Sequence, residues 1–124
     1  MQKVPILKVG DTLIISLQVE LHDKIVLKVQ EDILQKVYET SAGGLIIDMS
    51  AIEVIDSFMG KILSETAAMA RIMGAETVLV GIQPEIAITL QELGLKLKGV
   101  HTTLDLEEGM KLLQNIREVR NGEE

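Results

Sequence analysis

The 124-residue chain has no cysteine and no tryptophan, and it has one phenylalanine, one tyrosine and two histidines. Without cysteine it forms no disulfide, holds no cysteine-ligated zinc and has no cysteine nucleophile, which is typical of a reducing cytosol. Because only 2% of the residues are aromatic, the core must be built from aliphatic side chains and methionine. The single phenylalanine, Phe58, directly follows Ser57.

An excess of positive charge and a long apolar run are also missing. The formal net charge is −7 with only twelve lysines and arginines, whereas a nucleic-acid-binding protein needs a clustered excess of them. No apolar run approaches the roughly 20 residues that cross a bilayer, and the first residues do not form a signal peptide. The composition therefore predicts a soluble, cytoplasmic protein whose partners are neither nucleic acids nor membranes.

The chain contains no linker, repeat or low-complexity segment that would separate two domains. A chain of this length buries roughly two-thirds of the surface that its unfolded form exposes, so it can form a core without disulfides or structural metals. We expect a single domain over residues 1–119, followed by a loose polar tail over residues 120–124.

Apolar periodicity predicts strands that alternate with helices. Residues 4–9 and 12–17 are joined by Gly10 and Asp11, which predicts an antiparallel hairpin. Helical spacing begins at Asp23, the expected N-cap, and the glycines at 43–44 are expected to end that helix. Further strands are expected over residues 45–49, 77–80 and 100–104, with helices over 56–74, 84–94 and from 105 onward. This order predicts an α/β domain with a mixed, mostly parallel sheet and helices unevenly distributed over its faces.

The sequence offers little support for catalysis. Ser57 lies in IDSFM rather than in Gly-x-Ser-x-Gly, and the available bases, His22 and His101, lie far from it along the chain. No spacing typical of metal ligands occurs, and Lys61 is not part of a phosphate-binding loop. An enzyme in which one histidine and Ser57 line a common pocket remains an alternative.

Asp56 and Ser57 open a long helical pattern, and either is a good N-cap. An exposed serine there also suits a phosphate, because free N–H groups and the positive end of the helix dipole stabilise an anion. Phosphorylation adds about −1.5 to −2 charges, which would weaken a partner contact without unfolding the domain. We expect Phe58 to point inward and Met59 or Gly60 to be more exposed. These residues alone predict a small acidic binding module, regulated at Ser57.

The segment from Val54 to Phe58, placed between a buried strand and a long helix, resembles the phosphorylation motif of STAS domains, the bacterial anti-sigma-factor antagonist family. Supporting segments lie at residues 4–8, 30–34, 38–40, 81–84 and 104–109, so the resemblance covers nearly the whole chain. It is stronger for the stressosome branch than for the sporulation antagonists. Their motif continues with a second serine and a glycine, where this chain has Phe58 and Met59.

The resemblance implies a single STAS domain with about four helices, mainly on one side of the sheet, and no enzymatic activity, cofactor or metal. It also implies that Ser57 is the phosphoacceptor and that Asp56, Phe58, Met59 and Gly60 contact partners around it. Those partners are a switch serine kinase of the RsbT type, co-antagonists of the RsbR type, a phosphatase of the RsbX type and further copies in a large complex. The unphosphorylated form is expected to sequester the kinase, and phosphorylation to release it into a stress response. A passive scaffold or small-ligand binder without this switch is the alternative.

Overall fold

The computed structural model describes residues 4–18, 22–94, 97 and 99–122. Five strands form one sheet in the order β1-β2-β3-β4-β5, with β1 at Ile6–Val9, β2 at Thr12–Ser16, β3 at Gly44–Asp48, β4 at Glu76–Val80 and β5 at Val100–Thr103. The β1–β2 pair is antiparallel and the other neighbouring pairs are parallel. The hairpin predicted at Gly10 is confirmed, because Val9 pairs with Thr12 and Gly10 has a φ of +60°.

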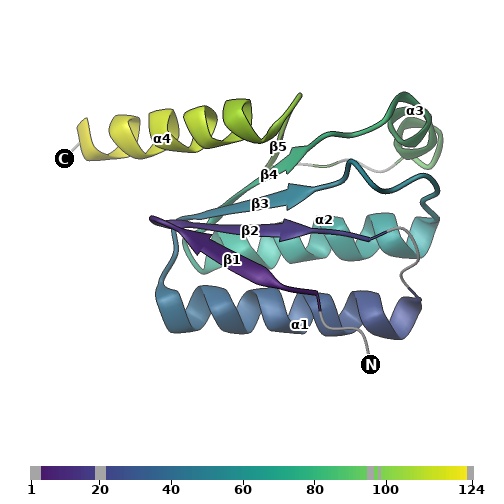
Figure 1. Ribbon diagram of the computed structural model, residues 1–124, viewed down its shortest axis with the longest axis horizontal. Coiled ribbons are helices and arrows are strands. Elements are labelled where there is room, and N and C mark those ends of the chain that lie inside the picture. Colours follow the sequence, from purple (N-terminus) through teal and green to yellow (C-terminus); the bar gives the residue numbers. More distant parts are fainter. Residues whose placement is uncertain (1–3, 19–21, 95–96, 98, 123–124) are drawn as a thin grey trace.

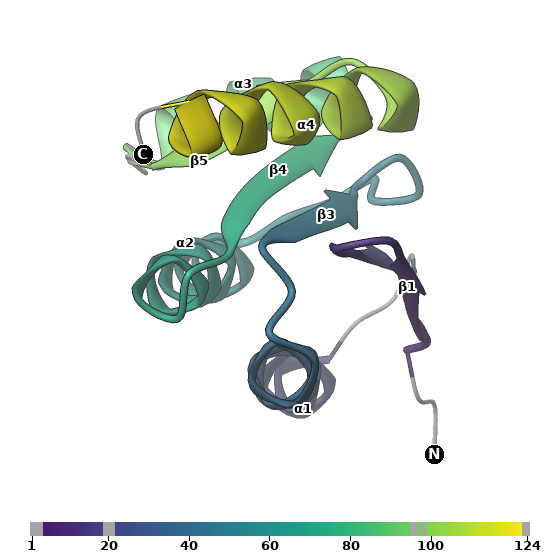
Figure 2. The same ribbon diagram turned by 90° about the vertical axis from the view of Figure 1, so that its left-hand side faces the viewer.

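Four helices cover the sheet unevenly. They are α1 (Asp23–Thr40), α2 (Ser57–Ile72), α3 (Pro84–Glu92) and α4 (Leu106–Gly122). The long helices α1 and α2 lie side by side against one face, and α4 lies on the other (Figures 1 and 2). Buried residues of α1, α2 and α3 share the larger core cluster, which confirms the predicted mixed sheet with most helices contributing to one core.

The strands divide their side chains between two aliphatic cores. Alternate residues point to opposite faces of a strand, so neighbouring positions of β3 enter different clusters. The larger cluster takes Leu13, Ile15, Leu45, Ile47 and Leu79 from the sheet. The smaller one joins Ile46, Val78 and Val80 to Leu113 of α4. Gly109 lets α4 approach closely, because a Cβ there would lie 3.0 Å from Cγ1 of Val80.

Both ends of α1 differ from the sequence prediction. Asp23 is the first helical residue and His22 occupies the N-cap, without a side-chain capping bond. Ser41 ends the helix in the left-handed conformation, with a φ of 55°, and its N–H donates to the Val37 carbonyl at 2.8 Å. Gly43 has a different role: a Cβ there would lie 2.5 Å from Oδ2 of Asp11. Its missing side chain therefore permits a close approach to the hairpin.

The final helix extends beyond its predicted limit. Residues 120–122, expected to belong to a loose tail, continue α4, and residues 123–124 lie outside the described part of the chain. Nη2 of Arg120 donates to Oε2 of Glu76 at 2.6 Å. This long-range contact holds the last turns of α4 against the start of β4.

Candidate functional site at the start of helix α2

The start of α2 follows the loop of residues 49–56, beyond the end of the sheet at which the parallel strands finish (Figure 1). Ile52 and Ile55 bury their side chains in the larger core. The N–H of Met49 donates to the Val80 carbonyl at 2.8 Å, and the N–H of Ile52 donates to the Met49 carbonyl at 3.0 Å. The loop is therefore attached to the core at several points and presents the start of α2 in a defined position.

A second loop supports the first one. The side-chain amide of Gln83 donates to the Ser50 carbonyl at 2.7 Å, and the N–H of Ser50 donates to Oδ1 of Asp48 at 2.9 Å. Gly81, with a φ of +70°, lies so close that a Cβ there would be 3.0 Å from Cβ of Ser50. These contacts tie the start of α3 to the loop that carries the candidate site.

Asp56, one of the two residues predicted to cap this helix, is the N-cap of α2. Its backbone is extended, and its Oδ1 accepts a hydrogen bond from the N–H of Met59 at 2.8 Å. The Asp56 carbonyl accepts from the N–H of Gly60 at 3.1 Å, which begins the helical pattern. Ser57 is the first helical residue, and both Asp56 and Ser57 are exposed. Asp56 thus caps the helix, and the exposed Ser57 lies next to the Asp56 carboxylate.

Phe58 points toward the core as expected, but the greater exposure expected of Met59 or Gly60 is wrong. Met59 is only 7% exposed and Gly60 is buried, whereas Phe58 is partly buried against the core. Met59 shares a helix face with Ile62 and Leu63, three and four residues further on, and this face packs against α1. Met59 and Gly60 therefore have little surface to offer a partner, and Asp56, Ser57 and Phe58 form the accessible start of the helix.

The two histidines occupy different surroundings. His101 lies on β5 and its Nε2 is 3.1 Å from Oε1 of Glu76, at the start of β4. Helix α2 runs from Ser57 back to the start of β4, where His101 contacts Glu76. Its 16 residues therefore separate Ser57 from the start of β4 by about 24 Å along the helix axis. His22 is exposed at the N-cap of α1, and no hydrogen bond among the described residues joins either histidine to Ser57. The structure therefore places His101 away from Ser57.

Metal ligands do not converge at this site. In the described part of the chain, no group of three or more histidine, aspartate or glutamate side chains could hold a metal ion. No helix among the described residues is long and apolar enough to span a membrane. The chemistry available at the start of α2 is that of one hydroxyl, one carboxylate and the positive end of a helix.

A charged cluster that no sequence motif indicates lies at the opposite end of the sheet. Glu76, almost fully buried, accepts from Arg120 at 2.6 Å, lies 3.1 Å from His101 and lies 3.8 Å from Nε of Arg71. Burial alone raises the pKa of Glu76, but the His101 hydrogen bond and the two arginines outweigh it and hold the pKa below its ordinary value of 4.5. In the sequence, the signal for this cluster is a glutamate at the start of an apolar strand. The residues that pair with Glu76 are 5 to 44 positions away along the chain, so no local motif connects them.

The chain belongs to the STAS domain family, which it matches over residues 3–109. Within that family it is similar to RsbS: it is 39% identical to a serine-to-glutamate variant of RsbS from Moorella thermoacetica, with a TM-score of 0.84 over 94% of this chain and 99% of that one. It is also 42% identical to a chain in a structure of the stressosome, a signal integration and transduction hub, with a TM-score of 0.80 over 91% of this chain and 98% of the other. The resemblance to anti-sigma-factor antagonists and their stressosome branch is confirmed.

Among curated proteins, the chain is similar to RsbT co-antagonist proteins. It is 30% identical over 84 residues to RsbRA of Bacillus subtilis, which covers 68% of this chain and 31% of the relative. The chain therefore spans about a third of the length of these curated relatives. Unphosphorylated SpoIIAA, an anti-sigma factor antagonist, shares the fold alone, with 17% identity and a TM-score of 0.73 over 91% of this chain and 97% of that one.

Proposed function

We propose that this protein is a phosphorylation-controlled antagonist in a stressosome-type complex. Its unphosphorylated form binds and sequesters a serine kinase of the RsbT type, and phosphorylation of Ser57 releases the kinase to activate a downstream stress response. A phosphatase of the RsbX type resets the switch. The observation that carries the proposal is the exposed Ser57 at the first position of α2, directly after an N-cap that Asp56 supplies by itself.

The geometry supports a switch that acts on a contact. A kinase surface that fits the neutral start of α2 must exclude water around Ser57. Phosphate would add about −1.5 to −2 charges beside the Asp56 carboxylate, and burying that charge without a waiting basic group costs several kcal/mol. A loss of about 3 kcal/mol in binding free energy lowers affinity more than a hundredfold. Phosphorylation is therefore sufficient to release a partner that covers this helix start.

The same geometry lets the domain keep its fold after modification. The side-chain oxygen that caps α2 belongs to Asp56, so a phosphate on Ser57 removes no capping bond. Phosphate at the first helical position also lies close to the positive end of the helix dipole, where an anion is favourable. The assembly can thus retain the modified subunit while it loses the kinase.

The relatives support membership of a multi-subunit complex. One similar chain comes from a stressosome structure, and the curated relatives are named as RsbT co-antagonists. We infer that the chain associates with RsbR-type proteins and with further copies of itself, and that its part in phosphoryl transfer is that of a substrate. The similarity to RsbS supports this role.

Phosphorylation mapping tests the proposal. The protein is incubated with an RsbT-type kinase and ATP in the presence of an RsbR-type co-antagonist, and the products are mapped by mass spectrometry. We expect one phosphate at Ser57 and none on Ser57→Ala. Ser50→Ala is the matched control, because it removes another exposed hydroxyl, from the loop that leads into α2, and leaves the backbone bonds of Ser50 in place.

Phosphate at another residue, or undiminished labelling of Ser57→Ala, would contradict the proposal. Normal assembly with the co-antagonist, together with no modification by the kinase, would instead support a passive scaffold.

A further inference from the structure

Val54 is exposed next to the candidate phosphoacceptor although its neighbours on both sides are anchored. Its side chain is 81% exposed, whereas those of Ile52 and Ile55 are buried in the larger core. Single exposed apolar residues are common on protein surfaces. Val54 differs from such residues because its loop is fixed on both sides and because it lies three residues before Ser57.

We propose that Val54 is an apolar anchor for the serine kinase that captures this protein and modifies Ser57. This inference rests on the proposed function and adds a contact to it. Three residues of chain span at most about 11 Å, whereas a typical interface of about 800 Å² per partner corresponds to a disc with a radius of about 16 Å. A kinase whose active site reaches Ser57 therefore extends over Val54.

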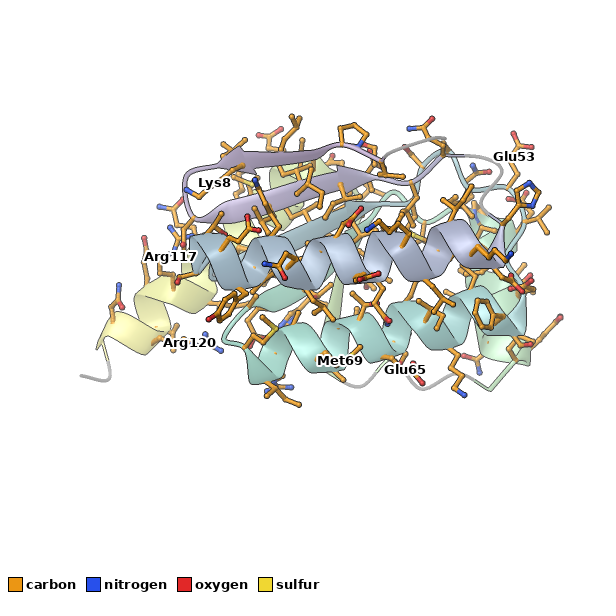
Figure 3. All side chains as sticks on the ribbon, turned by 90° about the horizontal axis from the view of Figure 1, so that it is seen from below. Lys8, Glu53, Glu65, Met69, Arg117 and Arg120 are labelled. Atoms are coloured by element: carbon orange, nitrogen blue, oxygen red, sulfur yellow. The ribbon has the colours of Figure 1, made fainter. Side chains whose placement is uncertain are left out.

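Among residues 53–58, around the candidate phosphoacceptor, Val54 is the large apolar side chain most exposed to solvent. Glu53, Asp56 and Ser57 are its exposed neighbours, and Phe58 is partly buried. Figure 3 shows Glu53 projecting from one end of the molecule, with Arg117 and Arg120 at the other. Interfaces gain most of their affinity from a few side chains that fill dehydrated pockets. Val54 is exposed and Phe58 is partly buried, so the Val54 side chain is available to fill such a pocket.

The anchor also explains how strongly phosphorylation acts. A contact that buries Val54 excludes water from the adjoining start of α2, so a phosphate on Ser57 would lose hydration within the same contact. Val54 thus contributes to capture, and Ser57 controls release. Because Val54 is not the reacting residue, its truncation should weaken kinase binding without slowing phosphoryl transfer in the bound complex.

Ile72 provides a matched control. It is 85% exposed and lies at the last position of α2, about 22 Å from Ser57 along the helix axis. Val54→Ala and Ile72→Ala therefore both remove exposed aliphatic surface, one near Ser57 and one far from it. Val54→Ile retains the apolar contact and serves as a conservative variant.

The test measures the affinity of the RsbT-type kinase for each unphosphorylated protein, and the steady-state kinetics of Ser57 phosphorylation. We expect Val54→Ala to weaken capture about tenfold, as expected for the loss of two buried carbon atoms, and to raise KM with kcat unchanged. Ile72→Ala and Val54→Ile should match the wild type. If the kinase binds the wild type and Val54→Ala with equal affinity, the role of Val54 is overturned and the proposed function still stands. Failure of the kinase to bind the wild type overturns both.

Discussion

At the scale of single residues, Asp56 and Ser57 divide two tasks that the sequence alone left together. Both residue types cap helices well, so the pattern predicted a cap at one or the other. The structure assigns the cap to Asp56, whose Oδ1 accepts from the N–H of Met59 at 2.8 Å. Ser57 is thereby available for modification. Local capping chemistry made this helix start predictable.

Substitutions at these two positions should have opposite effects on stability. Asp56→Ala removes the capping acceptor and should lower the free energy of unfolding by about 1 kcal/mol. Ser57→Asp adds a negative charge near the positive end of α2 and should leave that free energy unchanged or raise it by about 0.3 to 1 kcal/mol. Denaturant unfolding followed by circular dichroism measures both. A loss in Ser57→Asp as large as that in Asp56→Ala would show that Ser57 is structural.

The orientation of Met59 could not be predicted from the residues beside it. Successive helical residues point about 100° apart, so the apolar neighbours Phe58 and Met59 compete for the core. The packing of α2 against α1 decides the outcome: Met59 lines a shared cavity with Val26, Val29 and other residues of both helices. The local sequence signal for this choice is the spacing of Met59, which lies three and four residues before Ile62 and Leu63.

At the scale of elements, the strand and helix order was predictable, but the anchoring of α4 was not. Alternating periodicities indicated the α/β order, and Gly10 indicated the hairpin. Residues 120–122 looked like a loose tail because their polarity suggested no packing. The contact between Arg120 and Glu76 crosses 44 residues of sequence, and only the folded chain brings the end of α4 to the start of β4.

The Glu76 cluster predicts a stability contribution that depends on pH. The pKa of Glu76 is lowered on folding, so the folded state binds the proton less readily than the unfolded state does. The contribution is therefore complete above the pKa of the unfolded chain and is lost as the pH falls through the folded-state pKa. Glu76→Gln should be destabilised at pH 7, and its difference from the wild type should shrink on acidification.

Unfolding free energies of both proteins, measured from pH 7 to pH 3, check this expectation. Lys111→Gln is a suitable control, because Lys111 pairs with Glu107 and Glu108 on the exposed surface of α4, and such pairs contribute little. A difference between wild type and Glu76→Gln that stays constant over this range would contradict the lowered pKa.

At the scale of the whole molecule, the two ends of the sheet have different tasks. One end holds Glu76, His101 and Arg120 in a charged cluster that fastens α4. The other presents Val54, Asp56 and Ser57 on a supported loop and helix start. A contact at the Ser57 end can therefore be lost while the fold and the remaining surfaces stay in place. This separation supports the proposed function, in which the antagonist stays in its complex while it releases a kinase.

The composition, with no cysteine, two histidines and 2% aromatic residues, agrees with the proposed role. An aliphatic core and one exposed hydroxyl suffice for a protein that an enzyme modifies. Composition and motif order were sufficient to predict the family, whose match spans residues 3–109. The accessible residues before Ser57 could be identified only from the structure, because exposure separates Val54 from Ile52 and Ile55, its close neighbours along the chain.

The proposed switch depends on one event, the release of the kinase when Ser57 is phosphorylated. Its most direct test is the affinity of the RsbT-type kinase for the wild-type protein before and after stoichiometric phosphorylation, measured by isothermal titration calorimetry with the melting temperature of both forms as a control. We expect phosphorylation to weaken binding more than a hundredfold, or by about 3 kcal/mol, while the melting temperature does not fall. Equal affinity of the kinase for the two forms would contradict this expectation.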